Sequence, residues 1–254
     1  MIPFVHTDSV VRTIWGKSDT ILFIFAGAAA EFALNKAVDW LYFTGRLPAD
    51  PIGRLFSTVG YARRIVFASK EDAEKAIDKI TSIHGAVENV RSAKIPDWAY
   101  RDVLFMLIHY SIAAFELLEK KLTAREKEDV YDVFLRMGRR MNIPDLPSTY
   151  IDWLPVREAH MQHDLVKSKY TADLFLQYKK HLGSFRYKVL KEGQILVVPK
   201  TVSQLLGFKN ISLLSPIIPI YKFSRLLKLD GAIKWILLPA EYKKQIKELD
   251  IIPS

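Results

Sequence analysis

The sequence predicts an all-α fold, built as a single helical domain over residues 1–254. Apolar residues recur at steps of three and four along most of the chain, which is the spacing of one face of an α-helix. Helix-starting residues precede several of these stretches, and Gly or Pro follows them. We find no internal repeat, low-complexity tract or domain boundary. We therefore expect one domain, with a core over about 10–183 and a basic, apolar extension over about 184–254.

Two helices are expected in the first part of the chain. Asp50 suits the residue before a helix and Pro51 suits its first turn, so a helix should run to about Phe67. The tetrad 69–72 resembles a capping box for a second helix. Apolar residues follow it at helical spacing, and His84 falls on their stripe. We expect an amphipathic helix with His84 on its buried face.

The middle of the chain predicts a helix that is buried on all sides. Residues 103–115 are almost all apolar and lie within a helix expected over about 100–121. A helix that is apolar all round belongs in the centre of a bundle, so His109 should be buried. The tetrad 123–126 is another capping box, and it opens a helix that should end near Asn142.

The later segments also follow helical spacing. A linker rich in Pro, Asp and Ser is expected over about 142–155. We expect helices over about 157–167, 171–181 and 202–207, stops at Gly183 and Gly207, and a short strand over 194–198.

The composition removes whole classes of chemistry. The chain has no Cys, which excludes disulfides, thiolate metal sites and cysteine nucleophiles. It also lacks a phosphate-binding loop, a dinucleotide fingerprint, a Gly-x-Ser-x-Gly elbow and a His-Glu-x-x-His pair. A metal ion would therefore be held by carboxylate, Tyr, Met or one of six His residues.

The N-terminal segment and the charge distribution bear on location and partners. No basic stretch precedes an apolar one at the N-terminus, and no uncharged stretch reaches the roughly 20 residues of a spanning helix, so we expect a cytoplasmic protein. The net charge of +9 is uneven, because residues 167–254 hold 16 Lys and Arg against 6 Asp and Glu. This basic, apolar third suits peripheral contact with an anionic membrane or an acidic partner, or forms a solvated Lys-rich surface. We expect no nucleic-acid partner.

Several polar residues stand at apolar helical positions and are candidates for a binding site. His84 precedes Gly85, whose missing side chain would let a flat group approach the helix. A hydrogen-bonded core histidine is the alternative reading. Earlier in the chain, Arg54, Thr58 and Tyr61 are separated by steps of four and three residues, which places them on one helix face. They would form a polar pocket for a ligand, or a surface Arg with Thr and Tyr packed beside it.

A second candidate lies further along the chain. His160 and His163 share a helix face, and Glu158 and Asp164 place a carboxylate near each. A two-histidine metal site is one interpretation, but one helix alone supplies few ligands. A solvated amphipathic face is the other interpretation.

The order of these motifs resembles the rubber oxygenase (latex clearing protein) family and its MpaB-type oxygenase relatives. The resemblance extends over about residues 10–155, and it depends on the order and spacing of short motifs. These motifs are Asp50-Pro51, Arg54-Leu55-Phe56-Ser57-Thr58 with Tyr61, Ile83-His84-Gly85-Ala86-Val87, Leu107-Ile108-His109, Leu122-Thr123-Ala124-Arg125-Glu126 and Met141-Asn142-Ile143-Pro144.

The resemblance implies a globin-like core that holds haem b and an oxygenase that uses O2 on a hydrophobic small molecule. His84 is implied as the iron ligand. Burial favours the neutral form of an imidazole, and only the neutral form has a lone pair that can bind iron. Arg54 and Thr58 are implied as a catalytic polar pair in the haem pocket, which Tyr61 would also line. His109 is implied as a residue that supports the iron-binding histidine without binding the iron, or as the iron ligand itself.

The sequence also departs from the family pattern. Ser57 stands where rubber oxygenases have a lysine that can lie over the distal face of the iron. Their catalytic glutamate lies upstream of the arginine helix, where Asp39 is the candidate here and Glu31 lies further back. An alternative function is therefore a non-enzymatic helical protein that binds a lipid or another hydrophobic ligand at the membrane surface.

Overall fold

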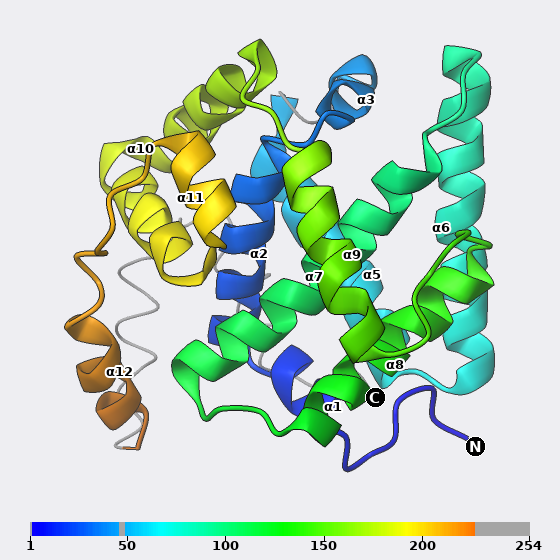
Figure 1. The fold of residues 1–254 in the computed structure, drawn as a ribbon, viewed down its shortest axis with the longest axis horizontal. Helices are drawn as coiled ribbons and strands as arrows, with labels where there is room; N and C mark the ends of the chain where they lie inside the picture. The colour runs from blue at the N-terminus through cyan, green and yellow to red at the C-terminus, as the bar shows by residue number, and fades with distance from the viewer. Residues whose placement is uncertain (1, 46–48, 227–254) are drawn as a thin grey trace.

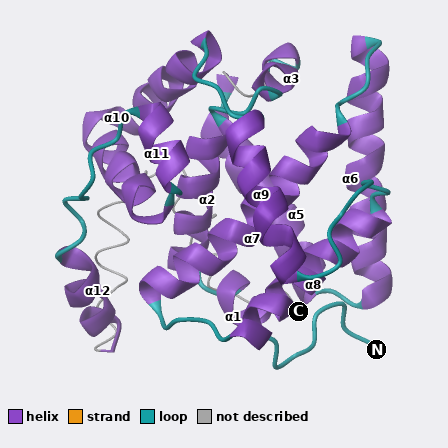
Figure 2. Ribbon diagram, in the orientation of Figure 1, coloured by secondary structure: helices purple, strands orange, loops and turns teal. Residues whose placement is uncertain are grey.

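The computed structural model describes residues 2–45 and 49–226, and these residues form helices and loops with no strand (Figure 2). The prediction of an all-α domain is confirmed. Two isolated β-bridges, Pro3 to Ser69 and Asn35 to Leu165, join loops. The helices are α1 (Val10–Trp15), α2 (Ser18–Phe32), α3 (Val38–Phe43), α5 (Pro51–Phe67), α6 (Lys70–Arg91), α7 (Asp97–Leu118), α8 (Ala124–Arg140), α9 (Tyr150–His163), α10 (Lys169–Val197), α11 (Lys200–Leu206) and α12 (Ile217–Leu226).

Helices α2 and α7 form the centre of the bundle, and each is the other's main packing partner (Figure 1). The apolar run of α7 is buried as predicted, with Phe105 and Ile108 at 0% exposure. Gly27 of α2 allows the close approach, because a Cβ there would lie 2.2 Å from the Tyr110 ring. Tyr110 therefore reaches across the α2 backbone into the centre of the domain.

Helices α5 and α6 begin where the sequence predicts. The Asp50 carboxylate accepts a hydrogen bond from the Gly53 amide at 2.8 Å, and Ser69 Oγ accepts one from the Asp72 amide at 3.2 Å. These side chains satisfy amides that have no partner within the helix.

The second half of α6 is more exposed than its sequence pattern predicts. Ala73, Ala76 and Ile77 are buried, but Ile83 is 38% and Val90 78% exposed. Figure 1 shows why, since this long helix runs along one edge of the bundle. His84 is therefore only partly buried, and the prediction of a fully buried stripe is wrong for this half of the helix.

The segment between α8 and α9 is shorter than predicted. The capping box of Thr123 and Glu126 is confirmed, and α8 ends at Arg140. Helix α9 already starts at Tyr150 and includes Pro155, so the predicted linker over 142–155 is wrong in its second half. Pro155 stands in the second turn of α9, beyond the first turn whose amides lack an acceptor within the helix, so it leaves the Ile151 carbonyl without its usual helical donor.

Helix α10 is longer than predicted and replaces the expected strand. The predicted stop at Gly183 is confirmed, because its φ of 72° and ψ of 165° are not helical and the resulting kink divides α10 into two helical segments. Residues 194–198 form its last turn and C-cap, so the strand prediction is wrong. The apolar side chains in this turn are buried against the helical core, which explains why their pattern resembled a strand. The stop at Gly207 is confirmed, with a left-handed φ of 67°.

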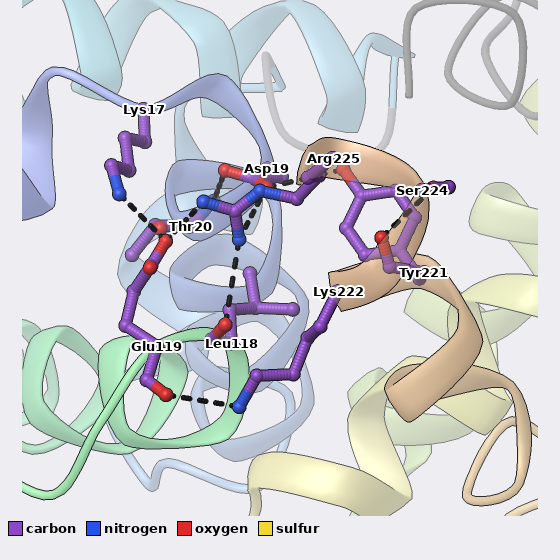
Figure 3. Close-up of polar contacts among 9 residues, drawn as sticks. All are labelled: Lys17, Asp19, Thr20, Leu118, Glu119, Tyr221, Lys222, Ser224 and Arg225. Carbon is purple, nitrogen blue, oxygen red and sulfur yellow. Dashed lines mark hydrogen bonds and ion pairs between the residues drawn. The ribbon is translucent and has the colours of Figure 1, made fainter. Parts of the chain in front are cut away.

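Helix α12 presents its polar side to the protein and an apolar side outward. Tyr221 is buried and donates to Asp19 at 3.1 Å, and Lys222 donates to the Glu119 carbonyl at 2.9 Å (Figure 3). Arg225 pairs with Asp19 at 3.4 Å and also contacts the Glu119 carboxylate. Exposed large apolar side chains in this part of the chain are Ile211, Leu213, Ile217, Ile220 and Phe223.

Among the described residues, every helix is too short or too polar to cross a bilayer.

Candidate functional site

The predicted ligand His84 lies on α6, where it faces α5 and the start of α7. Its ring makes an edge contact with Tyr100, with ring centroids 5.2 Å apart. Its Nδ1 atom is buried and has no hydrogen-bond partner within the described chain. Burial lowers the pKa of His84, and the nearby Arg54 guanidinium lowers it further. The imidazole is therefore neutral at pH 7 and has an unsatisfied nitrogen.

Arg54, Thr58 and Tyr61 lie on α5, and each is partly buried. The Thr58 hydroxyl donates to the Arg54 carbonyl at 3.2 Å, so it is held against its own helix. Arg54 is close enough to His84 to affect its pKa, so α5 and α6 bring these two predicted site residues together. This agrees with the helical spacing from which the group was predicted.

A cavity of about 330 Å³ lies beside this region, between α6, the start of α7 and the loop after α8. Gly85 lines it, and a Cβ added there would meet no atom within 4 Å. Tyr100 also lines it, and this ring contacts His84. The volume is at the lower end of the roughly 300–1,000 Å³ of ligand pockets. The other lining residues are Thr81, Glu88, Lys94, Ile95, Asp97, Met141, Asn142 and Ile143.

Asp39 lies on α3 and pairs with the end of α6. Its carboxylate accepts a hydrogen bond from Arg91 at 2.7 Å. The Arg91 guanidinium also lies over the Trp40 ring, 3.9 Å from its centroid. This predicted base is therefore held by Arg91 in the folded protein.

His109 lies on α7 in a different environment from His84. Its charged neighbours are Arg157 and Glu31, whereas those of His84 are Arg54 and Glu88. Burial is the main cause that lowers the pKa of His109 to about 4, with a further contribution from Arg157. His109 is also hydrogen-bonded to the Val197 backbone, so the structure places it in the polar centre between α7, α9 and α10.

That polar centre contains a buried ion pair that the sequence analysis did not identify. Glu31, at 0% exposure, accepts from Arg157 at 2.5 Å and from the Tyr110 hydroxyl at 2.7 Å. Although burial opposes its charge, the Glu31 carboxylate raises the pKa of Arg157 above its usual value. The pair thus joins α2, α7 and α9.

A second polar group lies one turn along α9. His160 Nδ1 is 2.6 Å from an Asp102 carboxylate oxygen and 3.3 Å from an Asp164 oxygen. Asn35 donates to the other Asp102 oxygen at 2.5 Å. His163 is exposed, so only one of the two predicted histidines enters this group.

Residues 15–221 match the model of a family described as ER-bound oxygenase mpaB/B'/rubber oxygenase, catalytic domain. The chain belongs to this family. The match spans most of the chain, so the resemblance found in the sequence is confirmed and extends beyond residue 155. Comparison with curated proteins and with solved structures finds no match.

The mpaB/rubber oxygenase domain thus has two polar regions, and the sequence predicted one of them better than the other. Arg54 and His84 were found because each stands at a helical step in a recognisable motif. Asp102 and Glu31 carry no motif, although an acidic residue within a long apolar helix is itself a sign of a buried partner. Their partners lie 58 and 126 residues away in sequence, and only the fold brings them together.

Proposed function

We propose that this chain is a haem b-dependent oxygenase that acts on a hydrophobic small molecule, with His84 as the iron ligand. The observation that carries the proposal is the buried, unpartnered Nδ1 atom of His84. A neutral imidazole with unsatisfied hydrogen-bonding capacity fits an axial haem ligand. Membership of an oxygenase family supports the reaction class. When bound, the haem would supply the iron at which O2 is activated.

In this proposal the chain's own residues bind and orient. Arg54 supplies a guanidinium near His84 that suits a propionate or another anionic oxygen, because charge-assisted hydrogen bonds are strong in a partly buried site. Thr58 and Tyr61 supply hydroxyls from the same helix. His109 would influence the haem pocket without binding the iron, from its own polar cluster with Arg157 and Glu31. Asp39 would serve as the base only after its hydrogen bond with Arg91 breaks.

The first test is a spectrum. Protein purified from haem-supplemented cells should show a Soret band and about one haem per chain by the pyridine haemochrome assay. His84→Ala should lose most of the haem, whereas His6→Ala, at an exposed histidine, should retain it. The absence of a Soret band in the wild-type protein, or full haem content in His84→Ala, would refute the proposal.

The second test separates binding from turnover. Arg54→Gln should weaken haem binding or slow O2 consumption with apolar unsaturated compounds at least about tenfold, because one charge-assisted contact is worth roughly 1.5–3 kcal/mol. Asp39→Asn should retain haem and slow only O2 consumption. Equal rates in wild-type protein and Asp39→Asn would remove Asp39 from the mechanism and leave the haem site standing.

The outward face of α12 favours a second function, peripheral docking on an anionic membrane. Ile220 and Phe223 are 67% and 62% exposed, while Tyr221 on the opposite side of the helix is buried. The basic third of the chain, 167–254, supplies the charge that attracts acidic headgroups. A cytoplasmic protein that docks in this way could take its apolar ligand from the bilayer, with or without oxidising it.

Vesicle sedimentation tests the docking. The protein should bind phosphatidylcholine vesicles that contain 30% phosphatidylserine, bind pure phosphatidylcholine vesicles weakly, and dissociate in high salt. Ile220→Ser with Phe223→Ser should reduce binding, whereas Ile2→Ser, at an exposed apolar residue far from α12, should not. Equal binding by all three proteins would exclude this face.

A further inference from the structure

Asp102, His160 and Asp164 place three metal-binding side chains around one point. One oxygen of each carboxylate and one nitrogen of His160 all lie within 4.8 Å of one another. Asp102 comes from the second turn of α7, His160 from the last turn of α9, and Asp164 from the C-cap of α9. His160 and Asp164 are four residues apart, so the helix itself sets them side by side.

Two cations near this cluster, Arg157 and Lys36, are each bound to another group. Asp102 is 1% exposed, and neither it nor Asp164 forms an ion pair with Lys or Arg in the described parts of the chain. The nearby Lys36 ammonium donates instead to the His163 carbonyl. Burial and repulsion from Asp102 raise the pKa of Asp164. Two carboxylates in such a place require a proton or a metal cation beside them.

The cluster is anchored by a hydrogen bond on one side and exposed to solvent on the other. Asn35 holds the Asp102 side chain in place, because its side-chain amide donates a hydrogen bond to the second carboxylate oxygen. This is the outer hydrogen bond that orients a metal-binding carboxylate. The Asp164 side chain is 18% exposed, so the cluster opens to solvent on that side. A small cation can therefore enter without unfolding the bundle.

We propose that Asp102, His160 and Asp164 bind one divalent transition-metal ion, at a site separate from His84. One nitrogen and two carboxylate oxygens suit Zn²⁺, Mn²⁺ or Fe²⁺, and no thiolate is present to select a softer metal. Ligand atoms around a tetrahedral zinc stand about 3.4 Å apart, given bonds of about 2.1 Å. The 3.3 Å contact fits this spacing, and the 2.6 Å contact has to open by less than 1 Å.

A proton on Nδ1 and a metal ion are alternative occupants, since both satisfy the same lone pairs. Metal binding through Nδ1 therefore requires the ring proton to lie on Nε2. Bound metal would tie α7 to the end of α9 and, through Asn35, to the α2–α3 loop. It would stabilise the domain in proportion to the free metal concentration.

Equilibrium dialysis against Zn²⁺, followed by metal analysis, tests the site. The wild-type protein should bind one equivalent, and Asp164→Asn and His160→Gln should each bind at least tenfold more weakly. His163→Gln is the matched control, because it removes the neighbouring exposed imidazole of the same helix and should bind as the wild type does. Mn²⁺ bound to the wild-type protein should show nitrogen coupling in pulsed electron paramagnetic resonance.

The outcomes separate this site from the haem proposal. His84→Ala should keep the Zn²⁺ equivalent, and Asp164→Asn should keep the Soret band. If Asp102 or His160 variants fail to fold, Asp164→Asn still decides the question, since its side chain lies at the open edge of the cluster. A wild-type protein that binds no Zn²⁺ at 100 μM and pH 7.5, or binding unchanged in Asp164→Asn, would overturn the metal site and leave only the His160–Asp102 hydrogen bond in its place.

Discussion

The polar centre between α2, α7 and α9 and the His84 region between α5 and α6 use charged side chains in opposite ways. In the centre, Arg157 meets Glu31 and His160 meets Asp102, so each charged group contacts a group of opposite or complementary charge. In the His84 region, the imidazole faces a guanidinium and its buried Nδ1 has no partner. The comparison teaches that ion pairs hold the helices together in the centre, although Glu31 Oε1 and Arg157 Nε lack a partner there, whereas the His84 region has an imidazole nitrogen that a ligand can satisfy.

The largest expected effect comes from breaking the buried pair in the polar centre. Glu31→Ala should lower the free energy of unfolding by about 3–5 kcal/mol, because it leaves the Arg157 charge buried without its partner. Urea unfolding followed by circular dichroism measures this loss. The double variant Glu31→Leu/Arg157→Met should be more stable than Glu31→Ala. A double variant that is less stable would show that the pair itself, and not the uncompensated charge, is what stabilises the domain.

The next effect is a pH dependence that belongs to His109. The folded-state pKa of about 4 lies below the usual 6.5, so the stability from the neutral ring is present above pH 6.5 and lost as the pH falls toward 4. The shift corresponds to at most roughly 3 kcal/mol. His109→Gln should flatten the stability profile between these pH values, measured by urea unfolding at several pH values. An unchanged profile would assign the acid sensitivity to other residues.

The sequence predicted local structure well and long-range polar contacts poorly, for a physical reason. The caps at Asp50, Ser69 and Thr123 each depend on a residue three positions away, so their patterns are visible in the chain. The burial of α6 depends on which helices lie beside it, so its apolar stripe predicted too much burial around Ile83.

The candidate site divides in the same way. The resemblance implied that Arg54 and His84 belong to one haem pocket, and the structure brings them close enough for Arg54 to lower the pKa of His84. His160 was predicted with His163, its neighbour in sequence, whereas its partner in the fold is Asp102. Spacing along a helix identifies residues on a shared face, but the opposing helix supplies the other half of a site.

A smaller effect tests whether α6 is energetically independent of the polar centre. Ser69→Ala should cost about 1 kcal/mol, because the Asp72 amide loses its acceptor. Hydrogen exchange should show faster exchange in the first turn of α6 and little change at Glu31 and Tyr110. Ser82→Ala, at an exposed position within the same helix, is the control and should have almost no effect. Faster exchange throughout α2 and α7 would contradict the separation of the two regions.

The smallest expected effect on stability is at His84, and it sharpens the comparison most. Without haem, His84→Ala should change the free energy of unfolding by less than about 1 kcal/mol, because the substitution removes an unsatisfied buried nitrogen as well as a partly exposed ring. With haem added, the wild-type melting temperature should rise with haem concentration and that of His84→Ala should not, since only binding to the folded state stabilises it. A loss of several kcal/mol in the haem-free variant would mean that His84 packs as a structural residue, and the contrast between the two regions would then fail.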